Sequence, residues 1–188
     1  MVNKLTMNLL ILLAIPCILY GRSFNVMDFG ARGNGISDDA IAIQKAVDAC
    51  TNAGGGDVVF SANHTFLSGP VQLKSNVNIV LETNSVWKAN PDESIYHLSA
   101  FGKNEGEGMM WIWAKDVENL SFSGHGTIHG NGIRFMGAEL FDSYELKPVT
   151  TFDPRPHVLT LMRVRNLNIR DITIREGAYW TVHLIGCD

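Results

Sequence analysis

Three side chains towards the C-terminal end of the chain carry groups that could hold a ligand: Arg155, Trp180 and His183. A tryptophan offers a flat ring that stacks on another ring, and a histidine can donate a hydrogen bond from a ring nitrogen. The guanidinium fork of an arginine matches a carboxylate. Each residue also has a structural reading. Trp180 can pack under a loop, His183 can be a solvated surface residue, and Arg155 can lock the turn that Pro156 stiffens.

Other reactive residue types along the chain have plainer interpretations. Trp111, Trp113 and His97 lie in or beside a long segment without strand patterns. They could form part of the wall of a cleft, although packing is the usual role of such aromatic residues. Asp38 and Asp39 precede a helical pattern, and we expect their carboxylates to cap it. No group of Cys, His and Asp has the spacing of metal ligands, so we expect neither a metal nor another cofactor.

The N-terminal segment differs from the rest of the chain. Lys4 in a short polar start is followed by an apolar run over residues 9–19, which is shorter than the roughly 20 residues of a membrane span. The pattern predicts a secretory signal peptide over residues 1–22 and a secreted or periplasmic domain over residues 23–188 that does not enter a membrane. Cys17 leaves a lipoprotein anchor open as a less favoured alternative.

The overall composition is that of a single globular domain, with 46% hydrophobic and 18% charged residues. A net charge of −4 argues against nucleic acid as a partner. Beyond the predicted signal peptide only Cys50 and Cys187 remain, one in a predicted helix and one close to the last residue. Two cysteines so placed do not form a disulfide framework, and we expect both to be free.

The elements that must position these residues are mostly short strands. Residues 24–29 alternate like a strand, Gly33-Asn34-Gly35 supplies a turn, and an amphipathic helix follows from residues 37–39 to the glycines at 54–56. Further alternating segments predict strands at residues 57–60, 65–68, 71–73, 77–82, 120–122, 127–130, 158–161, 167–170, 172–175 and 180–184. The helix is expected to cap the first open rim of the sheets.

A weak repeat places an asparagine before three of the strands, at Asn76, Asn119 and Asn166. Asparagine tolerates left-handed backbone angles and can hydrogen-bond to its equivalent in the next coil of a solenoid. No second long helix is visible, which argues against an alternating α/β fold. We therefore predict an all-β, right-handed parallel β-helix. Residues 90–113 and 132–155 interrupt the succession of predicted short strands, and long loops of this kind often carry binding surfaces.

The motifs also resemble a known family. The segments 24–31, 33–39 and 40–47 look like the N-terminal signature of the pectin-lyase-like β-helix superfamily. More specific are residues 67–77, residues 124–132, Arg155-Pro156-His157 and Trp180-Thr181-Val182-His183, which together resemble glycoside hydrolase family 28, the polygalacturonases and their relatives. The resemblance extends over residues 24–188.

This resemblance implies a pectic polysaccharide as the partner, polygalacturonate first and rhamnogalacturonan second. It implies hydrolysis of α-1,4-galacturonide linkages with inversion, by two carboxyl groups about 6.5–9.5 Å apart. The aspartates that the family uses lie in Asn-Thr-Asp and Asp-Asp segments that this sequence does not contain, and Asp38-Asp39 and Gly124-His125-Gly126 do not match the catalytic motifs. We therefore assign no catalytic residue.

The family pattern also places Trp180 and His183 on the floor of the cleft, one coil before the aspartates, where they would meet a sugar ring and a hydroxyl or uronate. The chain would then be the N-terminal portion of a monomeric enzyme, a β-helix truncated after its last predicted strand at residues 180–184. Alone it would be inactive.

Two other functions remain open. A non-catalytic carbohydrate-binding β-helix, of the tailspike or adhesin type, would share the fold without the aspartates. A polysaccharide lyase on the same fold would need acidic calcium ligands and an arginine base, and the later motifs favour it less.

Overall fold

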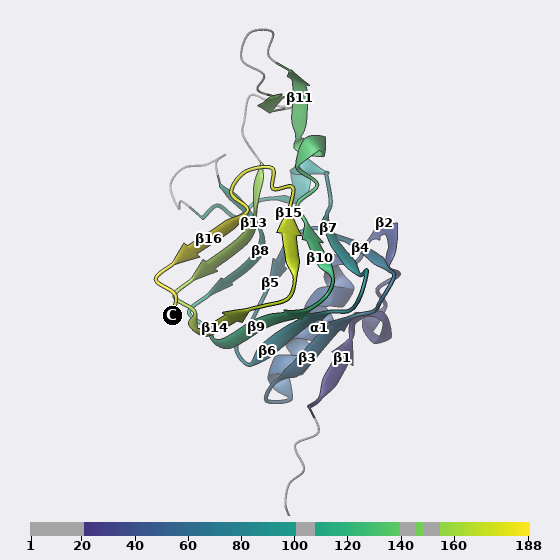
Figure 1. Cartoon of the computed structure of the whole chain (residues 1–188), viewed down its shortest axis with the longest axis vertical. Helices are drawn as coiled ribbons and strands as arrows, with labels where there is room; N and C mark the ends of the chain where they lie inside the picture. The colour runs from purple at the N-terminus through teal and green to yellow at the C-terminus, as the bar shows by residue number, and fades with distance from the viewer. Residues whose placement is uncertain (1–20, 101–107, 140–145, 149–154) are drawn as a thin grey trace, which may run out of the picture.

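The structure is a computed structural model that describes residues 21–100, 108–139, 146–148 and 155–188 (Figure 1). Residues 1–20, which hold nearly all of the predicted signal peptide, lie outside the described residues. No helix in the described ranges is both long and apolar enough to cross a membrane.

Three parallel sheets surround one core in the part of the chain that the structure describes (Figure 1). The first sheet contains β1 (Ser23–Asn25), β3 (Gly56–Phe60), β6 (Val77–Leu81), β9 (Glu118–Gly124) and β14 (Arg165–Ile169). The second contains β2 (Asn34–Asp38), β4 (Thr65–Ser68), β7 (Val86–Ala89), β10 (Thr127–His129) and β15 (Thr173–Arg175). The third contains β5 (Val71–Gln72), β8 (Met109–Lys115), β13 (Pro156–Met162) and β16 (Val182–Ile185). The chain visits the sheets in turn, and the predicted right-handed parallel β-helix is confirmed.

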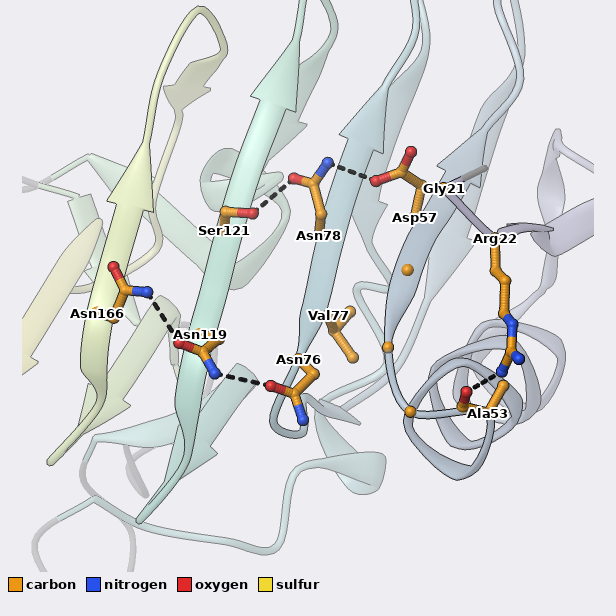
Figure 2. Close-up of a pocket in the computed structure, with 13 residues that line it drawn as sticks. Gly21, Arg22, Ala53, Asp57, Asn76, Val77, Asn78, Asn119, Ser121 and Asn166 are labelled. Atoms are coloured by element: carbon orange, nitrogen blue, oxygen red, sulfur yellow. Dashed lines mark hydrogen bonds between the residues drawn. The ribbon is translucent and has the colours of Figure 1, made fainter. Parts of the chain in front are cut away.

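The repeated asparagines form the predicted ladder at one corner of the coils (Figure 2). Asn76, Asn119 and Asn166 have left-handed φ angles of 63°, 55° and 56°. Asn119 donates from Nδ2 to Oδ1 of Asn76 at 2.8 Å, and Asn166 donates in the same way to Asn119 at 2.8 Å. The corner thus combines a backbone conformation that asparagine tolerates with hydrogen bonds between successive coils.

Helix α1 (Ala40–Asn52) covers the N-terminal rim of the stack, as predicted. It buries Ile43, Ala46, Val47 and Cys50 against the core. The capping prediction is right for Asp38, which accepts a hydrogen bond from the backbone N–H of Ala40 at 2.8 Å. It is wrong for Asp39, whose side chain makes no bond to the helix. Asp39 instead accepts from the N–H groups of Arg32 and Gly33 and ties down the preceding turn.

Two predictions for the first residues of the domain are corrected. The predicted strand 24–29 ends at Asn25, and a 3₁₀ helix, η1 (Val26–Phe29), follows. The side chain of Asn25 accepts from the N–H of Met27 at 2.9 Å, which favours a turn over an extended strand. The predicted turn at residues 33–35 instead leads into β2, because pairing with β4 supplies backbone partners for this segment.

The core contains aromatic residues from all three sheets. Phe60, Phe66, Trp87 and Trp111 are fully buried. The indole N–H groups of Trp87 and Trp111 both donate to the hydroxyl of Ser68, at 2.7 and 3.2 Å. Trp111 therefore packs inside and is not part of a cleft wall. Its strand β8 was missed because consecutive large residues in 109–112 hide the alternation of a strand. The short strand β7 was also missed.

Two of the connections between the second and third sheets, β7 to β8 and β10 to β13, are long. The first holds η2 (Glu93–Ile95), and residues 101–107 within it lie outside the described residues. The second holds η3 (Gly132–Phe135) and an antiparallel pair formed by β11 (Met136–Glu139) and β12 (Leu146–Pro148). Both described cysteines, Cys50 and Cys187, are free thiols.

Candidate functional site

The outer face of the third sheet presents one side chain from each strand in register. Its members are Gln72, Trp113, Thr160 and His183. The neighbouring row on the opposite face contains Ile112 and Leu159, which are fully buried in the core. Because side chains alternate across a strand, the row with His183 points away from the core. The structure thus places His183 and Trp113 on one outward face, whereas His97 is exposed after η2.

His157 forms the buried centre of a cluster on this sheet. Its ring stacks on Trp180, with centroids 5.1 Å apart and planes 19° apart, and on Tyr179 at 5.2 Å and 20°. His157 is fully buried, whereas 46% of Trp180 is exposed. The indole therefore rests on an imidazole and still reaches the surface. Trp180 lies just before β16, which begins at Val182 and not at residue 180 as predicted.

His183 completes the cluster from the neighbouring strand. Its Nδ1 lies 3.1 Å from Nδ1 of His157, and its ring meets Trp180 edge to face with centroids 4.5 Å apart. A hydrogen bond between two such nitrogens needs one proton, so one ring donates and the other accepts. This contact requires at least one of the two rings to be neutral.

The surroundings of both histidines favour the neutral form. Burial, and to a lesser extent the adjacent His183, together lower the pKa of His157 to about 4. Burial also lowers the pKa of His183. Desolvation acts in this direction because it disfavours the charged imidazolium. At neutral pH the pair therefore offers uncharged hydrogen-bonding groups beside Trp180.

Arg155 joins the same cluster through Tyr179. Its guanidinium carbon lies 5.0 Å from the centre of the Tyr179 ring, and Nη1 is 3.5 Å from the carbonyl of Ala178. These contacts join Arg155, which directly precedes β13, to the turn before β16, whereas the structural reading of Arg155 concerned its own turn beside Pro156. The fold thus brings all three sequence-predicted residues, Arg155, Trp180 and His183, to one place.

Sequence reasoning missed two members of the cluster, His157 and Tyr179. His157 stands in the Arg155-Pro156-His157 motif, and Tyr179 precedes Trp180, so both were adjacent to residues that had been singled out. The signals that could have identified them are the histidine that ends the Arg155-Pro156-His157 motif and the adjacent aromatic pair Tyr179-Trp180. Within the described ranges no group of three or more His, Cys, Asp or Glu residues could hold a metal ion.

Comparisons with known proteins agree with the motif resemblance. A family described as rhamnogalacturonase A/epimerase, pectate lyase-like matches residues 23–131. Mannuronan C5-epimerase AlgE1 of Azotobacter vinelandii is 32% identical over 175 residues, which are 82% of this chain and 12% of the epimerase. A polygalacturonase of Malus domestica is 28% identical over 167 residues, which are 87% of this chain and 33% of that protein. The chain thus spans a third or less of these two relatives.

A solved structure shares the fold. The hyperthermoactive exopolygalacturonase of Thermotoga maritima superposes with a TM-score of 0.71 at 23% sequence identity. The match covers 88% of this chain and 44% of the exopolygalacturonase.

Proposed function

The chain belongs to the rhamnogalacturonase A/epimerase, pectate lyase-like family, and from this we propose that it is part of a hydrolase of pectic polysaccharide. The bond cleaved is the α-1,4-galacturonide linkage, of homogalacturonan before rhamnogalacturonan. The observation that carries the proposal is the half-exposed Trp180 held on the buried His157 beside His183. We place the protein outside the cell or in the periplasm, as a monomer.

The cluster has the properties of a sugar-binding surface. An exposed indole can stack on the apolar face of a pyranose ring, and the neighbouring His183 can exchange hydrogen bonds with hydroxyl groups or a uronate. The stack on His157 fixes the indole before the ligand arrives, so little side-chain entropy is lost on binding. Arg155, held against Tyr179, adds positive charge near an anionic substrate.

In this proposal the cluster binds and orients substrate, while the reacting groups come from elsewhere in the whole protein. Inverting hydrolysis needs one carboxylic acid to protonate the leaving oxygen and one carboxylate to activate water. The five residues of the cluster, Arg155, His157, Tyr179, Trp180 and His183, contain no carboxyl group. Two neutral histidines with lowered pKa values are poor substitutes for that acid at neutral pH.

The test is release of reducing ends from polygalacturonic acid, comparing this 188-residue chain with the extended reading frame. The proposal expects activity from the extended protein alone. Binding of pectin by the extended protein without any release would support a non-catalytic carbohydrate-binding β-helix. Release by the short chain would contradict the placement of the carboxylates outside it.

A further inference from the structure

The outer face of the first sheet is hollowed into a polar groove (Figure 2). One hollow of about 660 Å³ begins at Arg22 and the glycines 54–56 and reaches Ser121. A second, of about 340 Å³, extends it to Arg170. The two share four lining residues: Asn78, Asn119, Ser121 and Asn166. They therefore form one continuous groove that crosses strands β3, β6, β9 and β14.

Amide and hydroxyl groups line the groove in two ordered rows. In the first row, Asn78 donates to the carboxylate of Asp57 at 2.7 Å and accepts from the hydroxyl of Ser121 at 2.8 Å. The second row is the asparagine ladder at the corner. Asn168 continues the first row in register with Ser121. Polar side chains thus recur at every strand, at the roughly 4.8 Å spacing of strands in a sheet.

These rows keep hydrogen-bonding capacity that the fold does not use. An asparagine side chain has two N–H donors and an oxygen with two acceptor positions. Asn119 uses one donor for Asn76 and one acceptor position for Asn166, and its side chain lines both hollows (Figure 2). The ladder bonds also fix the side chains in advance. A ligand would meet preorganised donors and acceptors, and binding would cost little side-chain entropy.

The charges of the groove select the kind of ligand. Arg22 and Asp57 lie at one end and Arg170 at the other, while the shared centre carries only amides and a hydroxyl. Arg22 is already engaged by the carbonyl of Ala53. An uncharged centre gives no advantage to a polyanion, whereas hydroxyl groups can pair with amide donors and acceptors alike. A linear chain of sugars, laid across the strands, would meet the same chemistry at each step.

We propose that this groove is a second glycan-binding surface, which takes a neutral, hydroxyl-rich polysaccharide chain running across the strands. It lies on a different sheet from the cluster around His157. The inference goes beyond the proposed function, because it requires neither hydrolysis nor a uronate. It would let the protein hold a neutral polymer while the third sheet meets an acidic one.

The test is affinity electrophoresis of the full chain in gels that contain soluble galactan, arabinan or xyloglucan, with polygalacturonic acid as the acidic comparison. The variant Ser121→Leu places an apolar side chain at the point that both hollows share. The matched control is Thr127→Leu, which changes a half-buried, outward residue of the same coil on β10 of the second sheet. Thermal unfolding verifies that each variant is folded.

We expect the unmodified chain to be retarded by at least one neutral polysaccharide and Ser121→Leu to bind it at least fivefold more weakly. Thr127→Leu should bind as the unmodified chain does. If Ser121→Leu fails to fold, Asn168→Leu replaces it, because the Asn168 side chain takes no part in the ladder. Equal binding by the groove variant, dimerisation in place of glycan binding, or no retardation by any neutral polymer would overturn the inference. Binding of polygalacturonic acid tests the proposed function separately.

Discussion

The Nδ1 atoms of His157 and His183 lie 3.1 Å apart across the neighbouring strands β13 and β16, although 26 residues separate them in the chain. The contact joins a fully buried ring to one at the surface. Protonation of both rings would place two cations side by side and leave no accepting nitrogen in the contact. The contact therefore needs at least one neutral ring, and the burial that lowers the pKa of both histidines favours the neutral form of each.

This arrangement predicts that the folded state loses stability in acid. The pKa of His157 falls from 6.5 to about 4 on folding, so between these values the unfolded chain binds more protons than the folded one. The free energy of unfolding must then decrease as the pH drops from 6.5 to about 4, by at most about 3 kcal/mol. The lowered pKa of His183 acts in the same direction. Urea unfolding at a series of pH values measures the slope.

The variant His157→Phe is the control for this slope, because phenylalanine keeps a ring under Trp180 and cannot titrate. Its unfolding free energy should vary less between pH 6.5 and 4 than that of the unmodified chain. An unchanged slope would show that other groups cause the acid sensitivity.

Trp180 is predicted to contribute most of the sugar contact of the cluster. Trp180→Ala should weaken binding of an oligogalacturonide about tenfold, since aromatic stacking is worth on the order of 1 kcal/mol. Trp180→Phe should retain part of the affinity. Val182→Ala is the matched control, because Val182 is comparably exposed but lies in the opposite row of β16. Titration calorimetry gives the dissociation constants, and equal losses for Trp180→Ala and Val182→Ala would contradict the role of the indole.

Ser68 is predicted to be the most sensitive small residue of the core. Ser68→Ala leaves the indole N–H groups of Trp87 and Trp111 buried without their acceptor, which should cost about 2–4 kcal/mol. Ser85→Ala should change stability by less than about 0.5 kcal/mol, because the buried Ser85 hydroxyl has no hydrogen-bond partner among the described residues. Denaturant midpoints compare the two, and similar losses would disprove the shared acceptor.

The asparagine ladder is predicted to stabilise the stack in two separable ways. One is the hydrogen bonds between its side chains, and the other is the left-handed backbone conformation that asparagine tolerates. Asn119→Gly removes two ladder bonds but tolerates the φ of 55°, and should cost about 1–2 kcal/mol. Asn119→Ala should cost roughly 1 kcal/mol more, because alanine is strained in that conformation. Equilibrium unfolding of the two variants checks the order, and a more stable alanine variant would refute it.

The local pattern of the sequence was enough to identify the solenoid. The alternation of apolar and polar residues located most strands, and the spacing of apolar residues predicted helix α1. The repeated Asn76, Asn119 and Asn166 predicted the ladder at the corner. These features depend on residues close in the chain or on a repeat, and both are visible without coordinates. Reliance on alternation also explains why strand β8 was missed, because its run of large buried residues does not alternate.

Only the tertiary structure decided which reactive residues meet. The sequence singled out Arg155, Trp180 and His183, but the pairing of β13 with β16 placed His157 against the indole of Trp180. Trp111, on β8, packs in the core. The groove on the first sheet likewise needs four coils in register before its polar rows exist. Register between coils depends on the lengths and paths of the intervening loops, which alternation within a strand does not encode.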